Sequence, residues 1–388
     1  MKLLRTLSTS RLVLLLIAVA VLAAGVAAIA VAASGGSGPT PPPKPLAEAL
    51  HDSLSGPSPK GVTARIKFTN KLFPSGAITG QVGSALMSGA SGRLWATNDG
   101  RGRLELQSNA GDVQVVWNDT EVTVYDASSN TVYRAELPAD AKSSADHSGI
   151  PSVAKISDFL AKLGEHASLS SAEPSNVAGQ EAYTVRVSPK HDGGLLGAAE
   201  LAFDASRGVP LRLGIYAQGE STPVLELAAS NISYGSVPAS EVNVAPPAGA
   251  KSVDLGSLTR NSKDTAGQLH ASGLKAVQAA ASFPVVAPDR LVGLPRQDVR
   301  LVGKTDSKAA LVVYGHGLGA IVVVERAGAG GSSGAMGSLP QVSLNGVTAH
   351  ELATQLGTAL TWKRGDVTYV LAGSVPPAAA EAAARALG

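Results

Sequence analysis

The chain has 388 residues, no cysteine, and 32 Lys and Arg against 30 Asp and Glu, which gives a formal net charge of +2. The lack of cysteine excludes disulfides, thiol chemistry and a cysteine-acylated lipoprotein signal, so the folded domains must depend on core burial. The near-neutral charge gives no electrostatic reason to expect a nucleic-acid partner. A composition of 44% hydrophobic and 16% charged residues is typical of globular domains.

Residues 1–34 indicate export from the cytoplasm. The segment before Leu12 carries three cations and no acid, and the run from Leu12 to Ala33 contains no charge and no proline. As a helix this run is about 33 Å long, enough to cross a hydrocarbon core of about 30 Å. We expect either a retained membrane anchor with its basic flank in the cytoplasm, or a signal peptide that is cleaved near Ala33. The first case gives a cell-membrane protein with a single span and extracytoplasmic domains, and the second gives a secreted one.

A Gly- and Pro-rich linker over 35–45 should be stiff and extended. Leu46, Leu50 and Leu54 share one stripe, which predicts a helix over 46–54. Short alternating segments with polar turns between them then predict an antiparallel meander. Its expected strands are 62–69, 92–97, 102–108, 112–117, 121–126 and 131–136.

The apolar period changes over 152–166, which predicts an amphipathic helix. Strands resume after it, and the whole domain, over 46–250, should hold about ten antiparallel strands. The expected strands of this second half are 182–187, 199–203, 211–217, 224–229 and 232–234.

A partly helical connector is expected over 251–283, followed by a smaller α+β domain over 284–388. Thr348 and Glu351 match a capping box, which predicts a helix through Leu360. The other expected elements are strands at 298–302, 309–314, 320–326 and 367–372, a flexible loop at 328–337 and a final helix at 376–387.

Catalytic patterns are incomplete in this sequence. A zinc-protease helix starting at His350 needs a second His where the chain has Thr354. Ser152 and Lys155 have the serine–lysine spacing of penicillin-binding enzymes, but the partner motifs Ser-Asp-Asn and Lys-Thr-Gly do not occur. The glycines of 315–319 lie between two expected strands, which favours a hairpin turn over a phosphate site. We therefore expect no catalytic residue, no metal site, no cofactor and no enzyme activity.

The large sheet itself predicts a binding site. About ten antiparallel strands need their apolar face covered, and the sequence offers only one or two helices for this. The sheet can fold on itself as a packed sandwich, or it can curl around a cavity that the 152–166 helix partly closes. A curled sheet leaves an apolar cavity suited to lipid chains or to an apolar protein segment.

Strand alternation gives the candidate lining of such a cavity, and the helix gives a candidate lid. The lining residues are Ile66, Phe68, Leu104, Leu106, Val113, Val115, Leu201, Phe203, Leu213, Ile215, Leu225 and Leu227. The lid residues are Ile156, Phe159, Leu160 and Leu163. Replacing Leu106 with Glu should separate the two architectures, because a wet cavity tolerates a carboxylate and a packed core does not.

Three segments carry a family resemblance: GRLWATNDGRGRLELQSNAGDVQVVWNDTEVTVYDASSNTVYRAE (92–136), VAGQEAYTVRVSP (177–189) and AELAFDASRGVPLRLGIYAQGESTPVLELAASNISYG (199–235). Their order of strands and turns resembles the LolA-like lipoprotein-carrier superfamily, which includes the MucB/RseB-type periplasmic regulators. The resemblance covers roughly 46–250. It implies a half-open barrel with a helical lid over a cavity that accepts acyl chains. MucB/RseB-type proteins also have a second, smaller domain that contacts an anti-sigma factor, and 284–388 is compatible with that plan.

The sequence thus predicts an α+β protein: an N-terminal membrane helix, a curled antiparallel half-barrel with a helical lid, and a smaller C-terminal α+β domain. The first functional hypothesis is a membrane-tethered extracytoplasmic carrier or sensor that binds lipid or lipoprotein acyl chains without covalent chemistry. The alternative is an RseB-like regulatory protein that binds an envelope partner such as an anti-sigma factor.

Overall fold

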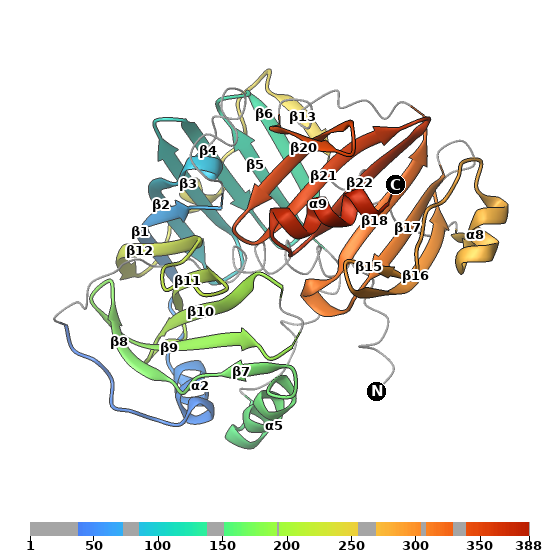
Figure 1. Cartoon of the computed structure of the whole chain (residues 1–388). Coiled ribbons are helices and arrows are strands. Elements are labelled where there is room, and N and C mark those ends of the chain that lie inside the picture. Colours follow the sequence, from blue (N-terminus) through green and yellow to red (C-terminus); the bar gives the residue numbers. More distant parts are fainter. Residues whose placement is uncertain are drawn as a thin grey trace.

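A computed structural model describes residues 38–72, 85–137, 151–191, 194–254, 269–303, 308–328 and 339–387 (Figure 1). The fold is α+β and mostly β, with few helices and two curled sheets that do not close. The predicted membrane helix within 1–34 and the loop at 329–337 lie outside the described residues. Within the described ranges, no helix combines the length and the apolar character needed to cross a membrane.

The first half of the large sheet is the predicted meander. Its strands are β1 (Gly61–Asn70), β2 (Ala90–Thr97), β3 (Gly102–Ser108), β4 (Gly111–Trp117), β5 (Glu121–Asp126) and β6 (Thr131–Glu136), with the short helix α3 (Ala85–Ser88) before β2. Turn chemistry fixes these boundaries as expected. Asn118 Oδ1, for example, accepts the backbone N–H groups of Thr120 and Glu121 at 2.8 and 2.9 Å.

The second half of the sheet returns to the first through the pairing of β1 with β12. Its strands are β7 (Ala167–Leu169), β8 (Glu173–Val177), β9 (Gln180–Pro189), β10 (Leu196–Asp204), β11 (Pro210–Ala217) and β12 (Leu225–Tyr234). The strand order is β13-β6-β5-β4-β3-β2-β1-β12-β11-β10-β9-β7, with β8 also paired to β9. The sheet has 13 strands rather than about ten, because the short strands β7, β8 and β13 (Lys251–Asp254) were not expected.

Two predicted helices of this part are confirmed: α2 (Leu46–Ser55) and α5 (Val153–Leu163). A further short helix that was not predicted, α6 (Ala239–Val242), forms a single turn after β12. The proline-rich segment before α2 is held to the sheet, since the Tyr183 hydroxyl donates to Pro42 O at 2.6 Å and the Asn176 amide donates to Pro39 O at 2.8 Å.

The second sheet has nine strands in the order β14-β16-β17-β18-β22-β21-β20-β19, with β15 paired to β16. Helix α9 (Pro377–Ala386) lies against β21 and β22 and buries Ala380, Ala383 and Ala384 (Figure 1). The glycines of 315–319 form the expected link between β17 and β18, with a 3-10 turn at Gly317–Gly319. The strands are β14 (Leu269–Ser272), β15 (Arg290–Leu291), β16 (Leu294–Val302), β17 (Ala309–Tyr314), β18 (Ile321–Ala327), β19 (Gln341–Leu344), β20 (Val347–Thr354), β21 (Gly357–Arg364) and β22 (Val367–Gly373).

The helix predicted over 348–360 is wrong, because these residues form the antiparallel hairpin of β20 and β21. A spacing of four residues fits a strand, whose side chains alternate with period two, as well as a helix. The predicted stripe is split in the structure. Leu360 is buried in the core of the second sheet, and Leu352 is partly buried on the opposite face of that sheet. Leu356 lies in the turn between β20 and β21. Gly357 disfavours a helix interior, and the threonines of this segment favour a strand.

The segment 251–283 is shared between the two sheets. Strand β13 pairs with β6 of the first sheet in parallel. Strand β14 and helix α8 (Leu274–Ala280) belong to the second sheet, and 255–268 lie outside the described residues.

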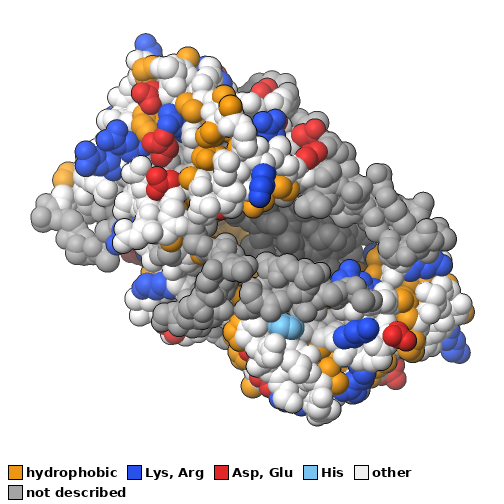
Figure 2. All heavy atoms as spheres, turned by 90° about the horizontal axis from the view of Figure 1, so that it is seen from above, with side chains coloured by type: hydrophobic (Ala, Val, Ile, Leu, Met, Phe, Trp, Pro, Cys, Tyr) orange, Lys and Arg blue, Asp and Glu red, His pale blue; other side chains and the backbone are white. Residues whose placement is uncertain are grey.

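The two sheets also meet at a few direct contacts. Leu195 N donates to Ser374 Oγ at 2.9 Å, and the Gln355 side chain donates to Lys71 O at 3.0 Å. The face seen from above shows basic, acidic and hydrophobic side chains interspersed, in keeping with a net charge near zero (Figure 2).

The core of the second sheet contains one buried acid. Glu325 on β18 is 0% exposed, and its Oε2 accepts the Val286 N–H at 2.9 Å. Its other oxygen has no hydrogen-bond partner among the described residues. Burial raises the pKa of Glu325 to about 7, and the Val286 N–H opposes that rise only in part.

Candidate functional site

A continuous row of apolar side chains crosses five strands of the first sheet. Leu213 of β11 lies directly opposite Leu201 of β10 and Leu227 of β12. Leu201 in turn faces Val185 of β9, and Leu227 faces Phe68 of β1. Directly paired residues project from the same face of a sheet. We name these five residues the apolar row; with strands about 4.8 Å apart, it extends about 19 Å.

Most of the apolar row is incompletely covered by the protein. Leu201 is 36% exposed, and Phe68, Leu213 and Leu227 are partly buried. Ile215 and Leu225 are paired with each other two residues further along the same face, and both are also partly buried. A sheet face of this kind has apolar surface that another apolar group can still remove from water.

The twelve residues predicted to line a cavity fall into two groups. Five are packed in the core, with exposures of 2 to 7%: Ile66, Leu104, Leu106, Val113 and Phe203. Seven keep part of their surface: Phe68, Val115, Leu201, Leu213, Ile215, Leu225 and Leu227. Packed side chains therefore prevail over β1 to β4 and partly exposed ones over β10 to β12. Phe203 of β10, Phe68 of β1 and Val115 of β4 are the exceptions.

Helix α2 covers the β9 end of the apolar row. Ala49 is fully buried in a cluster with Tyr183, Val185 and Phe203. Helix α5, the predicted lid, packs against α2, and a ring nitrogen of His51 lies 3.0 Å from Pro151 O just before α5.

The four predicted lid residues have unequal environments. Ile156 is buried, Leu160 and Leu163 are partly buried, and Phe159 is 63% exposed. Helix α5 therefore presents a large aromatic side chain to solvent.

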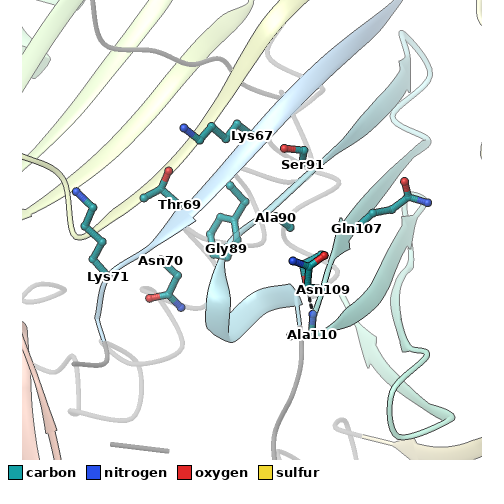
Figure 3. A pocket seen from close by; sticks show the side chains of 12 residues that line it. Lys67, Thr69, Asn70, Lys71, Gly89, Ala90, Ser91, Gln107, Asn109 and Ala110 are labelled. Carbon is teal, nitrogen blue, oxygen red and sulfur yellow. Dashed lines mark hydrogen bonds between the residues drawn. The ribbon is translucent and has the colours of Figure 1, made fainter. Parts of the chain in front are cut away.

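A pocket of about 650 Å³ lies where β1 ends and β2 begins (Figure 3). Asn70 shapes its rim, since its amide donates to Leu86 O at 2.7 Å and accepts the Leu72 N–H at 2.9 Å. None of the described lining residues is acidic, and two are lysines. The lining residues are Lys67, Phe68, Thr69, Asn70, Lys71, Gly89, Ala90, Ser91, Gln107, Ser108, Asn109 and Ala110.

Except for Phe68, sequence reasoning missed this pocket. Lys67 and Thr69 alternate along β1, and Lys71 follows its end, as an ordinary solvated face would. Only the strand register brings Ser91 and Gln107 beside Lys67, and that register is not visible in the sequence.

The opposite face of β9 to β12 carries a network of ion pairs. Arg212, next to Leu213 on β11, pairs with Glu226 at 2.7 Å and also with Glu200. Burial disfavours the charged guanidinium, but the hydrogen bonds to Glu226 and Glu200 outweigh it and raise the pKa of Arg212 above its ordinary value. Arg186 pairs with Glu200 at 3.3 Å. The network therefore links the four strands β9 to β12 behind the apolar row.

The residues of the incomplete catalytic patterns have structural roles. Ser152 caps α5, where its Oγ accepts the Lys155 N–H at 3.4 Å. His350 lies on β20 with a ring nitrogen 3.3 Å from Leu339 O. The described part of the chain contains no group of three or more His, Cys, Asp or Glu side chains placed to hold a metal ion.

No known protein family and no curated protein matches the sequence. Among solved structures, the chain is similar to MucB in the complex structure of Pseudomonas aeruginosa MucA/MucB, with 18% identity, 87% of this chain and 94% of that chain covered, and a TM-score of 0.41. It is also similar to a putative outer membrane lipoprotein-sorting protein domain from Vibrio parahaemolyticus, with 10% identity, 51% and 95% coverage, and a TM-score of 0.24.

Proposed function

We propose that the chain is an envelope carrier or sensor that binds the acyl chain of a lipid or lipoprotein on the apolar row. The observation that carries this proposal is the incomplete burial of Leu201, Leu213 and Leu227 on one continuous face. A hydrocarbon chain suits such a face, because it offers no polar group that needs a partner and the backbone groups of paired strands are already satisfied.

The sequence supports a membrane tether for this carrier. The apolar run ends at Ala33, and Pro39, whose carbonyl oxygen accepts a hydrogen bond from the Asn176 side chain, is six residues further along the chain. Six residues span at most about 22 Å. If the run is retained as an anchor, the body therefore stays next to the membrane surface that supplies its ligand.

The proposed activity involves no covalent chemistry. An acyl chain is held by removing apolar area from water, at roughly 25 cal/mol per Å². Such binding needs neither a nucleophile nor a general base, and Ser152 and His350 are engaged in the structural contacts described above.

A second candidate is a regulator that binds an envelope protein through the second sheet. On the face opposite α9, Val324 lies opposite both Leu311 and Val370, and Val313 lies opposite Val322. All five side chains are partly buried. An apolar partner segment would fit this face, and an anti-sigma factor is the class that the sequence resemblance implies.

Mass spectrometry of an organic extract tests the first candidate. The full chain, purified from membranes in mild detergent, should retain lipid, and Leu213→Glu should lose most of it because the carboxylate must desolvate or take up a proton. Val370→Glu is the matched control, since Val370 is also a partly buried strand residue. Equal lipid in both variants, or none in the unmodified chain, contradicts the proposal; loss of a co-purifying protein from Val370→Glu alone favours the second candidate.

A further inference from the structure

Two arginines face each other on neighbouring strands of the first sheet. Arg65 of β1 and Arg93 of β2 are register partners, and both are exposed. The Cα atoms of such partners are about 4.5–5.5 Å apart, and like charges placed directly opposite are destabilising. The sheet therefore keeps an unfavourable cation pair at its surface.

Two lysines extend this charge on the same face. Lys67 follows Arg65 by two residues on β1, and Lys71 is the first residue after β1 ends; both are exposed. We name Arg65, Lys67, Lys71 and Arg93 the basic face. In the described part of the chain none of the four has an ion-pair partner.

The acids nearest to the basic face are engaged or distant. Glu105 lies opposite Arg93 but pairs with Arg103. Glu226 lies opposite Thr69 but pairs with Arg212. Asp112 is three strands away from Lys67, or about 14 Å. Glu105 offsets part of the charge of Arg93, and a net positive charge, carried mainly by Arg65, Lys67 and Lys71, remains on this face.

Two further features mark the same place. The pairing of β1 with β12 shifts register between Arg65 and Ile66, and such bulges re-aim side chains at functional positions. The pocket described above also begins here, so that Ser91 and Gln107 offer hydrogen bonds beside Lys67.

We propose that the basic face docks on the anionic phosphate head groups of the membrane to which the chain is tethered. This inference rests on the tether proposed above. A body held within about 22 Å of the bilayer can bring exposed cations inside the screening length of about 8–10 Å. Basic clusters next to a membrane segment are attracted to anionic lipid, and their contribution falls with salt. Docking would orient the sheet relative to the bilayer.

The test uses the full chain in lipid nanodiscs. Because the chain has no cysteine, Asn231→Cys gives a single fluorophore site opposite Arg65, and Thr348→Cys on β20 gives a control site. Quenching by a lipid with a spin-labelled head group reports proximity to the surface. Discs with phosphatidylglycerol are compared with discs of phosphatidylcholine alone.

The expected result is strong quenching at position 231, and not at 348, only in the anionic discs. The combined variant Arg65→Gln, Lys67→Gln, Arg93→Gln should reduce it roughly fivefold, as should salt near 1 M, where the screening length is about 3 Å. The matched control is the combined variant Lys275→Gln, Arg326→Gln, Lys363→Gln, which removes three exposed cations outside the first sheet. It should leave the quenching at position 231 unchanged.

Four results would overturn the inference. Equal quenching in neutral discs, or no effect of the triple variant, removes the role of the basic face and points instead to an acidic protein partner. Loss of quenching on adding inorganic phosphate, but not chloride of equal ionic strength, assigns the site to a free phosphate. A chain that does not enter the discs contradicts the tether and this inference with it. Lipid retention in the extract experiment is unaffected by the first three, so the carrier proposal is judged separately.

Discussion

Phe68 of β1 and Leu227 of β12 lie directly opposite each other in the antiparallel pair that joins the two halves of the first sheet. Phe68 also lines the pocket at the end of β1. One residue thus belongs to both features, so the apolar row and the pocket meet at this position. Strands that are far apart in sequence build the candidate site together.

The packed and open parts of the sheet should respond differently to truncation. Leu106→Ala should lower the free energy of unfolding by about 2–4 kcal/mol, because Leu106 is 2% exposed and the change leaves a cavity. Leu213→Ala should cost about 1 kcal/mol, because its side chain already meets solvent. Amide hydrogen exchange in β3 and β11 measures both losses. Equal losses would place Leu213 in a packed core.

Arg212 should be more important for stability than a surface cation. Arg212→Met leaves Glu200 and Glu226 without their shared partner, at an expected cost of about 3 kcal/mol. Adding Glu200→Gln and Glu226→Gln to the same chain should restore much of the loss, because no carboxylate is then left unpaired, and Arg186, which loses Glu200, is 38% exposed to solvent. Denaturant unfolding of the three chains gives the comparison, and a single variant as stable as the unmodified chain would refute it.

Glu325 should make the second sheet less stable as the pH rises. The folded state holds its proton up to about pH 7, whereas the unfolded state releases it near the ordinary pKa of 4.5. The contribution is therefore fully present below about pH 4.5 and is lost as the pH rises through about 7. Tyr314 and Tyr369, whose pKa values are raised above the ordinary 10, stay neutral in this window.

Glu325→Gln tests this dependence, because an amide does not titrate. The free energy of unfolding, measured by thermal unfolding, should fall by up to about 3 kcal/mol between pH 5 and pH 8 in the unmodified chain. It should fall much less in the variant. The pKa of Glu351 is also raised, first by burial and then by Glu381, so Glu351→Gln should remove a further part of the same decline. A parallel decline in the Glu325 variant would show that the acid is not responsible.

The membrane tether predicts fractionation. The full chain should sediment with membranes and resist a high-salt wash, since the run from Leu12 to Ala33 is long enough to span the hydrocarbon core. Mass spectrometry of the mature chain checks the same point. A soluble form that begins at Ser34 would show cleavage and contradict the tether.

The sequence was sufficient for the meander because its local signals agree with each other. Between 92 and 136, alternation of apolar residues and turns such as Asn98-Asp99-Gly100 both specify strands, and the structure has them within two residues. The 348–360 prediction failed because Leu352 and Leu360 belong to two strands with a turn between them, so that their spacing is not the period of a single element. Local pattern alone could not choose between a helix and a hairpin held by its neighbours.

The candidate site was only partly predictable for a different reason. Alternation identified Leu201, Leu213 and Leu227 as one-face residues, but it could not separate them from the packed Leu106, because coverage depends on which elements lie above a strand. The basic face needs the pairing of Arg65 with Arg93, which depends on strand register. That register is set by long-range packing and a bulge, neither of which leaves a local signal.

Photo-crosslinking tests the central claim most directly. A fatty acid that carries a diazirine in the middle of its chain is irradiated with the full chain in membranes, and the adducts are mapped by mass spectrometry. We predict adducts in the peptides that hold Leu201, Leu213 and Leu227, and their loss in Leu213→Glu while hydrogen exchange shows the sheet still folded. Adducts confined to 12–33, or unchanged labelling of the apolar row in the variant, would contradict the account.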